Sequence, residues 1–255
     1  LILCFARSKE PHKALLTYGE MRRNHPAMRT YVATFVALMK ACGELKDVDR
    51  GHDLHVDVVN NGLLEESNSF LGNTLVHMYS KCGSFAKAQK VFETLPVRDV
   101  VSWTALITGI DAMYSEDAMN FFEYMQLEGV SPNVATFVCV LKVCSSTKAI
   151  EKGREIHIDI EKKGFLEGEV VIGNALVDMY AKCGSFTNAV NLFEKLPIRD
   201  KVSWTSLIMG YTRQRYGEKA LQHFEQMQVE GICLDSVAYL CSLKACSYST
   251  RVESI

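Results

Sequence analysis

The sequence predicts an all-α fold, a solenoid of stacked two-helix repeats, and three observations predict it. The chain repeats itself, because residues 69–99 align without gaps to residues 170–200 with 18 of 31 positions identical. Within the repeats, apolar residues recur at helical spacing. Glycine and proline stand at regular breaks between the apolar segments. Self-similarity at a fixed period is the signature of a repeat architecture.

The repeat is present throughout the chain. DVVSWTALITG at 99 returns as DKVSWTSLIMG at 200, and VATFVALMKAC at 32 returns as VATFVCVLKVC at 134 and more weakly as SVAYLCSLKAC at 236. The copies that begin at 69 and 170 start 101 residues apart. Each such block divides into three units, and each unit has an apolar first segment, a polar break and a second segment.

The second segments carry a fixed stripe, in which a small residue is followed by apolar residues at +3, +4 and +7. Two copies of the stripe are Ala88, Val91, Phe92 and Leu95, and Ala189, Leu192, Phe193 and Leu196. This spacing places all four side chains on one face of an α-helix. A two-helix unit cannot bury such a stripe alone, so neighbouring units are expected to stack.

The breaks match the ends of helices. Gly83 and Gly184 follow the first segments, where a left-handed residue commonly ends a helix. Pro96 and Pro197 follow the second segments, where proline ends a helix because it has no N–H group to donate. Each unit is therefore predicted to be a helical hairpin.

Composition limits the function classes. The 255 residues are 48% hydrophobic and 23% charged, with a formal net charge of −2, which argues against a nucleic-acid binder that is basic over its whole surface. The nine cysteines include no CxxC pair and indicate a reducing compartment. No apolar run approaches the ~18 residues of a membrane span, and the first residues are neither Arg-rich nor apolar in the way of a targeting leader. Leu1 falls inside a repeat, so we expect a fragment of a longer protein.

The units resemble pentatricopeptide repeats of the PLS subclass, in which P, long and short motifs alternate. The run GNALVDMYAKCG followed by a closing LPIRD resembles a short motif most clearly. Tetratricopeptide repeats are the alternative, but their 34-residue period and Trp/Gly/Tyr pattern are missing. The resemblance divides the chain as follows: a partial P motif at 1–31, long motifs at 32–68 and 134–169, short motifs at 69–99 and 170–200, P motifs at 100–133 and 201–235, and a partial long motif at 236–255.

The resemblance implies a right-handed superhelix that binds single-stranded RNA. In the family, the fifth and last residues of a repeat together select one base. Carried onto this chain, the pairs are Asn73 with Asp99, Thr104 with Asn133, Asn174 with Asp200, and Thr205 with Asp235. The implied preferences are U for Asn–Asp, A for Thr–Asn and G for Thr–Asp, so the expected target is 5′-U-A-N-U-G-3′. A polar residue in these positions is otherwise often a helix cap or a solvated residue.

Other positions complete the implied site. The long motifs carry Val36 with Asn68 and Val138 with Glu169, which are poor base-reading pairs. The second residue of each reading repeat is expected to pack between bases. These second residues are Phe70, Val101, Val171 and Val202.

No residues predict catalysis, a cofactor or a metal site. His223 and Glu225 form an HxE triplet like that of zinc deaminases, but no PCxxC follows, and His223 occupies a packing position of the stripe. His52 and His55 could face a metal together, yet His55 and His157 hold equivalent stripe positions, which favours interior histidines. Trp103 and Trp204 are read as packing residues.

The resemblance also implies a biological setting. The expected role is part of a plant organellar RNA-editing or processing factor, in a mitochondrion or chloroplast. Other editing factors, or a deaminase domain beyond Ile255, are possible partners on this basis. A protein-binding solenoid is the second hypothesis, and Lys and Arg beside the base-reading row would distinguish RNA binding from it.

Overall fold

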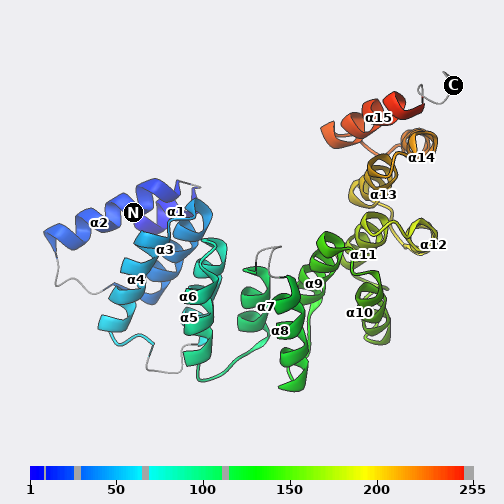
Figure 1. Ribbon diagram of the computed structural model, residues 1–255. Helices are drawn as coiled ribbons and strands as arrows, with labels where there is room; N and C mark the ends of the chain where they lie inside the picture. Colours follow the sequence, from blue (N-terminus) through cyan, green and yellow to red (C-terminus); the bar gives the residue numbers. More distant parts are fainter. Residues whose placement is uncertain (9, 26–29, 65–68, 111–114, 250–255) are drawn as a thin grey trace. The chain divides into compact units, whose positions relative to one another are not determined.

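The computed structural model describes residues 1–8, 10–25, 30–64, 69–110 and 115–249. These residues form helices and no strands (Figure 1). The chain divides into two compact units, residues 1–132 and 133–255. The first unit contains α1 (Ile2–Arg7), α2 (Pro11–Asn24), α3 (Val32–Leu45), α4 (Val48–Asn60), α5 (Ser69–Lys81), α6 (Phe85–Thr94), α7 (Val100–Thr108) and α8 (Ser115–Leu127). The second contains α9 (Val134–Thr147), α10 (Ile150–Lys162), α11 (Val170–Lys182), α12 (Phe186–Lys195), α13 (Lys201–Arg213), α14 (Gly217–Val229) and α15 (Ser236–Ser249).

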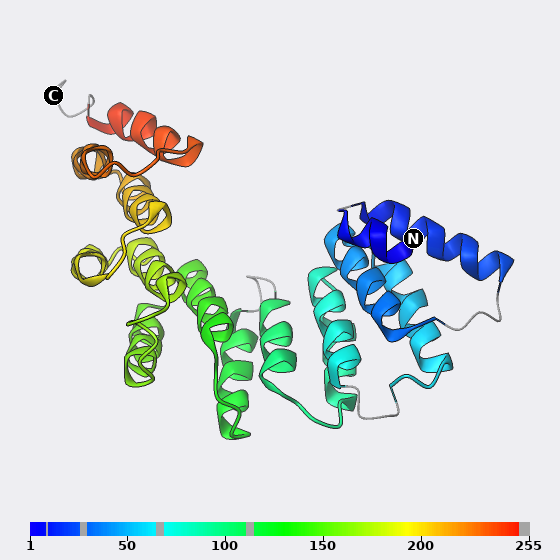
Figure 2. The ribbon, with the colours of Figure 1, turned by 180° about the vertical axis from the view of Figure 1, so that it is seen from behind.

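In each unit, consecutive helices pair as hairpins whose first helices form a continuous row. In the first unit α1 packs on α3, α3 on α5 and α5 on α7; in the second α9 packs on α11, α11 on α13 and α13 on α15. Each second helix packs on the first helix of its own hairpin and, where another hairpin follows in the same unit, on the first helix of that hairpin. Figures 1 and 2 show α10, α12 and α14 on one side of the row formed by the second unit's first helices. The predicted all-α solenoid of stacked hairpins is confirmed.

Small residues allow the first helices of successive hairpins to approach closely. A Cβ atom on Gly109, directly after α7, would lie 2.7 Å from the Cα atom of Ser80 near the end of α5. A Cβ atom on Gly210 of α13 would lie 2.6 Å from the Cβ atom of Ala181 in α11. Real side chains do not approach so closely, so both crossings depend on glycine.

The breaks and stripes lie where the sequence predicts them. Gly83 and Gly184 have φ values of 74° and 79° just after α5 and α11, in the left-handed region that glycine tolerates. Helices α6 and α12 end at Thr94 and Lys195, shortly before Pro96 and Pro197. The stripe residues are buried in both copies, except that Leu95 is half-buried. No helix among the described residues has the length and apolar character needed to span a membrane.

Candidate nucleic-acid interface

A hydrogen-bonded asparagine–aspartate pair joins two successive first helices in the first unit. Asn73, on α5, is buried, and its Nδ2 donates to both carboxylate oxygens of Asp99 at 3.0 Å. Asp99 also caps α7, because its Oδ1 accepts from the backbone N–H groups of Val101 and Ser102 at 3.0 and 2.9 Å. A carboxylate accepts hydrogen bonds and does not donate them, so it fixes which side of the Asn73 amide faces it.

The second unit contains the same arrangement. Asn174 on α11 donates to the two oxygens of Asp200 at 3.0 and 3.1 Å. Asp200 caps α13 by accepting from the backbone N–H groups of Val202 and Ser203, both at 2.9 Å. Among the described residues, the Oδ1 atoms of Asn73 and Asn174 are buried and have no hydrogen-bond partner. An unpaired buried acceptor is costly, so a hydrogen bond from a ligand N–H group to either oxygen would remove that cost.

Thr205 and Asp235 do not form such a pair. The Thr205 hydroxyl donates to the carbonyl of Lys201 at 2.9 Å, within its own helix. The Asp235 carboxylate accepts from the backbone N–H of Ala238 at 2.9 Å and lies 3.6 Å from the Lys201 ammonium. The N–H of Ala238 is the largest cause of the lowered pKa of Asp235. Within the described structure the two side chains share no hydrogen bond.

Thr104 lies in the first unit and Asn133 begins the second. The Thr104 hydroxyl donates to the carbonyl of Val100 at 2.7 Å. Asn133 caps α9 in a capping box, with its Oδ1 accepting from the backbone N–H of Thr136 at 2.9 Å. Both side chains therefore have partners inside their own units.

The four predicted packing residues are exposed apolar side chains near the starts of the first helices. Their exposed fractions run from 50% to 59%. Each lies three residues before its predicted reading residue, one helical turn away. These residues are Phe70, Val101, Val171 and Val202. Exposed apolar groups beside polar amides suit the faces and edges of unstacked bases.

The predicted long-motif positions have no equivalent polar pair in the part of the chain that is described. Val36 is buried, and its predicted partner Asn68 lies outside the described residues. Val138 is half-buried on α9, whereas Glu169 is exposed just before α11.

A basic cavity of about 490 Å³ lies in the second unit, between the C-terminal ends of α9, α11 and α13. These helices belong to the row that also carries Asn174. Lys182 makes an ion pair with Asp178 at 2.6 Å. The cavity's charged lining residues are Lys142, Lys148, Lys182 and Arg213. Sequence reasoning missed this cluster, although the cations recur at the ends of successive first helices.

His55 and His157 pack between successive hairpins, whereas His223 packs within its own. His55 and His157 share hydrogen bonds with Tyr79 and Tyr180 at 3.0 and 2.9 Å. Burial lowers the pKa of both histidines and raises that of Tyr79 to about 12. His223 stacks on Tyr211 with ring centroids 5.3 Å apart. No cluster of three or more possible metal ligands occurs in the described residues.

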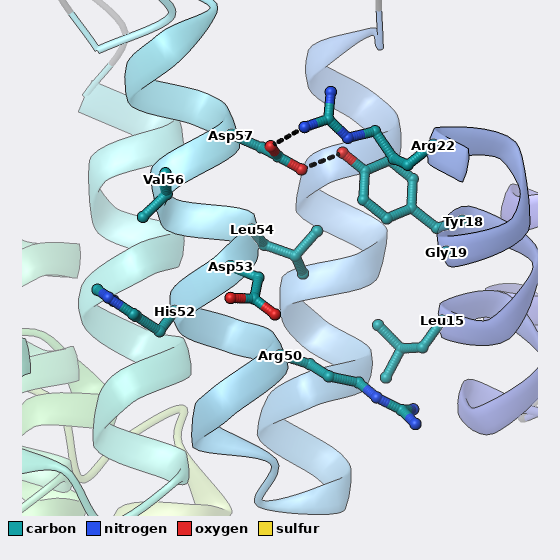
Figure 3. A pocket seen from close by; sticks show the side chains of 10 residues that line it. All are labelled: Leu15, Tyr18, Gly19, Arg22, Arg50, His52, Asp53, Leu54, Val56 and Asp57. Carbon is teal, nitrogen blue, oxygen red and sulfur yellow. Dashed lines mark hydrogen bonds and ion pairs between the residues drawn. The ribbon is translucent and has the colours of Figure 1, made fainter. Parts of the chain in front are cut away.

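A second polar cavity, of about 550 Å³, lies between α2 and α4 in the first unit. Figure 3 shows Tyr18 and Arg22 pointing at the Asp57 carboxylate. The Tyr18 hydroxyl donates to Asp57 at 2.8 Å, and Arg22 makes an ion pair with the other carboxylate oxygen. These polar groups satisfy one another and join the two second helices, away from the asparagine–aspartate pair.

Comparisons with known proteins agree with this architecture. The chain matches the PPR repeat family over residues 199–247, the pentatricopeptide repeat domain over residues 97–147, and the PPR repeat over residues 1–25, 73–100 and 174–199. It is 36% identical over 247 residues to a chloroplastic pentatricopeptide repeat-containing protein of Arabidopsis thaliana, covering 96% of this chain and 39% of that protein. It is 31% identical over 255 residues to a putative mitochondrial one from the same plant, covering 99% of this chain and 40% of that protein.

Among solved structures, the fold resembles the pentatricopeptide repeat protein PPR10 in complex with an 18-nucleotide psaJ RNA element. The TM-score is 0.75 at 15% sequence identity, over 100% of this chain and 38% of that one. The present chain thus spans less than half the length of each of these proteins. Helical hairpins in a continuous row, together with these matches along the sequence, show that the chain belongs to the pentatricopeptide repeat family.

Proposed function

We propose that this chain binds single-stranded RNA and selects uracil at two positions through Asn73 with Asp99 and Asn174 with Asp200. The observation that carries the proposal is the recurrence of one hydrogen-bonded pair in both units, with the same free amide oxygen. Uracil presents an N–H donor on its Watson–Crick edge, which the free Oδ1 atom can accept. Phe70 and Val171, one turn away, supply apolar surface for the base face.

The charge distribution favours RNA over a protein partner. Although the whole chain has a formal net charge of −2, four cations line one cavity on the helices that carry the second pair. Phosphate neutralisation by Lys and Arg supplies much of the affinity for nucleic acid. Binding to a protein does not in itself require four positively charged residues around one cavity.

The wider proposal follows the expected register of the repeats. With Thr104 and Asn133 preferring A, and Thr205 and Asp235 preferring G, the target is 5′-U-A-N-U-G-3′. The RNA-bound structure of PPR10 supports RNA as the ligand class. Relatives named chloroplastic and mitochondrial support an organellar location. A role in RNA editing or processing is proposed from the family resemblance of the repeats. Any editing activity would reside in other factors or in a deaminase domain outside this chain.

The test is a titration of the chain against labelled RNA that contains UANUG, beside an RNA in which the second U is replaced by G. Asn174→Thr should exchange the preference at that position from U to G. Asn73→Thr should do the same only at the first U, and Asn191→Thr, on the outer helix α12, should leave both preferences unchanged. Equal binding of both RNAs by the wild type and by Asn174→Thr would refute base reading by this pair and favour a protein ligand.

A further inference from the structure

A lysine stands beside the last predicted reading pair in the second unit. Lys201 is the first residue of α13, and Thr205 follows it at i+4, so both side chains leave the same face of the helix. The Lys201 ammonium lies 3.6 Å from a carboxylate oxygen of Asp235. The backbone carbonyl of Lys201 accepts the Thr205 hydroxyl at 2.9 Å. The lysine therefore contacts both members of the predicted pair.

Lys201 takes the place at Asp235 that an asparagine amide holds at Asp200. Both aspartates accept backbone N–H groups at the start of the following helix. Asp200 has a second partner in the Asn174 amide, which donates to its two oxygens. At Asp235 the second partner is the Lys201 ammonium. A charged donor from one turn earlier in the helix thus replaces the neutral donor of the reading position.

This ion pair is open to a ligand. The side chains of Lys201 and Asp235 are 49% and 31% exposed. The backbone N–H of Ala238 and, after it, the Lys201 ammonium lower the pKa of Asp235, so the carboxylate is ionised near neutral pH. The ammonium has more N–H donors than one carboxylate oxygen uses. The first residues of the four predicted reading repeats are Ser69, Val100, Val170 and Lys201, so only the last of these repeats begins with a charge.

The two charged groups match the edge of a keto base. Guanine and uracil present a carbonyl oxygen beside a ring N–H, whereas adenine and cytosine present an amino group beside a ring nitrogen that accepts. An ammonium only donates hydrogen bonds and an ionised carboxylate only accepts them. Lys201 beside Asp235 therefore favours a keto base. Guanine also offers its 2-amino group as a second donor to the carboxylate.

We propose that Lys201 is a third base-reading residue of the last repeat, donating to O6 of guanine while Asp235 accepts from its N1–H. The inference rests on the proposed RNA binding. It assigns the choice of G over A at this position to the lysine, because the Thr205 hydroxyl is bonded within its own helix. A lysine that contacted only a phosphate would strengthen binding of every base alike.

Three RNAs that differ only in the last base of UANUG test the assignment: guanine, adenine, and hypoxanthine, which has O6 and N1–H but no 2-amino group. Lys201→Met should weaken binding of the guanine and hypoxanthine RNAs about tenfold and of the adenine RNA at most about twofold, because a charge-assisted hydrogen bond to O6 is lost. Equal weakening of all three RNAs, as a phosphate contact would cause, overturns the inference. So does an unchanged ratio of guanine to adenine binding, or a loss for guanine alone.

A matched control removes the same charge elsewhere in the second unit. Lys195 is exposed at the end of the outer helix α12. Lys195→Met should change the three affinities by less than about twofold and leave the ratio of guanine to adenine unchanged. A loss of guanine preference in this control equal to that in Lys201→Met would overturn the inference, because charge at a distance would then account for the effect.

A transplant of the lysine provides the second test. Val170 matches Lys201 in the repeat that carries Asn174 and Asp200. Adding Val170→Lys to Asn174→Thr reproduces the set of lysine, threonine and aspartate, and should raise the preference for G over A at the second U position about fivefold above Asn174→Thr alone. If Asn174→Thr exchanges U for G but neither lysine change alters the G-to-A ratio, the inference fails and the proposed function stands. If Asn174→Thr has no effect on base preference, base reading itself fails.

Discussion

The two units carry the same asparagine–aspartate pair in different electrostatic surroundings. The amide-to-carboxylate distances agree to 0.1 Å between them. At the C-terminal ends of the same helices, however, the second unit has the basic cavity, whereas the matching positions of the first unit include an acidic residue. The sequence alignment of the two blocks matches Lys142 with Lys40, Ser146 with Glu44, Lys148 with Lys46, Lys182 with Lys81, and Arg213 with Ala112. Base choice and phosphate affinity can therefore vary separately between copies of one repeat.

The largest difference that we expect between the units concerns stability at equivalent helix crossings. Gly109→Ala should lower the free energy of unfolding by about 2–3 kcal/mol, because the new Cβ atom meets the backbone of Ser80. Gly210→Ala should lower it by only about 1 kcal/mol, since the backbone atoms of Ala181 lie 3.3 Å or more from the new Cβ atom and alanine favours the helix interior. Urea denaturation followed by circular dichroism would measure both, and equal losses would contradict the difference.

The next effect is on RNA affinity. Arg213→Glu combined with Lys142→Glu should weaken binding at low salt about tenfold, or about 1.4 kcal/mol. It should also flatten the slope of log K against log salt by about 0.7 for each lost phosphate contact. Lys40→Glu combined with Lys81→Glu in the first unit is the matched comparison and should have a smaller effect. Equal effects from the two double variants would show that the basic cavity has no special role.

A smaller effect concerns His223, whose matching residue in the first unit is Phe121. Its Nδ1 atom is buried without a partner among the described residues, and burial is the main cause of its lowered pKa. His223→Phe should therefore raise the free energy of unfolding by about 0.5–1 kcal/mol near neutral pH.

The pH dependence of this variant has a defined sign. In the unfolded chain this histidine takes up a proton near pH ~6.5, whereas in the folded protein it does so only at lower pH. Its protonation therefore does not affect the free energy of unfolding above pH ~6.5 and lowers it as the pH falls. His223→Phe should lose part of that decline in melting temperature between pH 7.5 and 5, while His12→Phe, at an exposed position, should not. A steeper acid decline in His223→Phe would contradict the assignment.

The smallest effect is an exchange of single residues between the units. Glu44→Ser should strengthen RNA binding two- to threefold, and Ser146→Glu should weaken it by a similar factor, because one exposed charge beside the strand is screened by water and salt. Both would be measured in the same low-salt titration. Opposite signs would indicate that the phosphates do not pass these helix ends.

The helices could be predicted from sequence because two independent signals agree. The apolar stripe of Ala88 recurs at helical spacing, and Gly83 and Pro96 mark the helix ends by backbone chemistry alone. The positions of Asn73 and Asp99 could also be predicted, but only through family resemblance, since nothing in a stretch of 26 residues indicates that its two ends touch.

Other parts of the site depend on packing between distant segments. The basic cavity brings together Lys142 and Arg213 from different hairpins, while the total charge of −2 points the other way. The hydrogen bond between His157 and Tyr180 likewise depends on how two hairpins stack. The contrast between Asn174, held by its aspartate, and Thr205, bonded within its own helix, depends on side-chain length. Sequence patterns record periodicity well and such geometry poorly.

The last residue of each predicted reading pair also begins the next helix, and this sets a limit on how these arrays can evolve. Asp99, Asn133, Asp200 and Asp235 all accept backbone N–H groups at the start of the following helix. Only a few side chains cap well, chiefly Asn, Asp, Ser and Thr, and replacing one by alanine costs about 1 kcal/mol. The last residue of each pair is therefore restricted to these few side chains, because it must also cap the next helix. Under the proposed function, a change of RNA target can therefore replace the last residue only by another side chain that caps a helix.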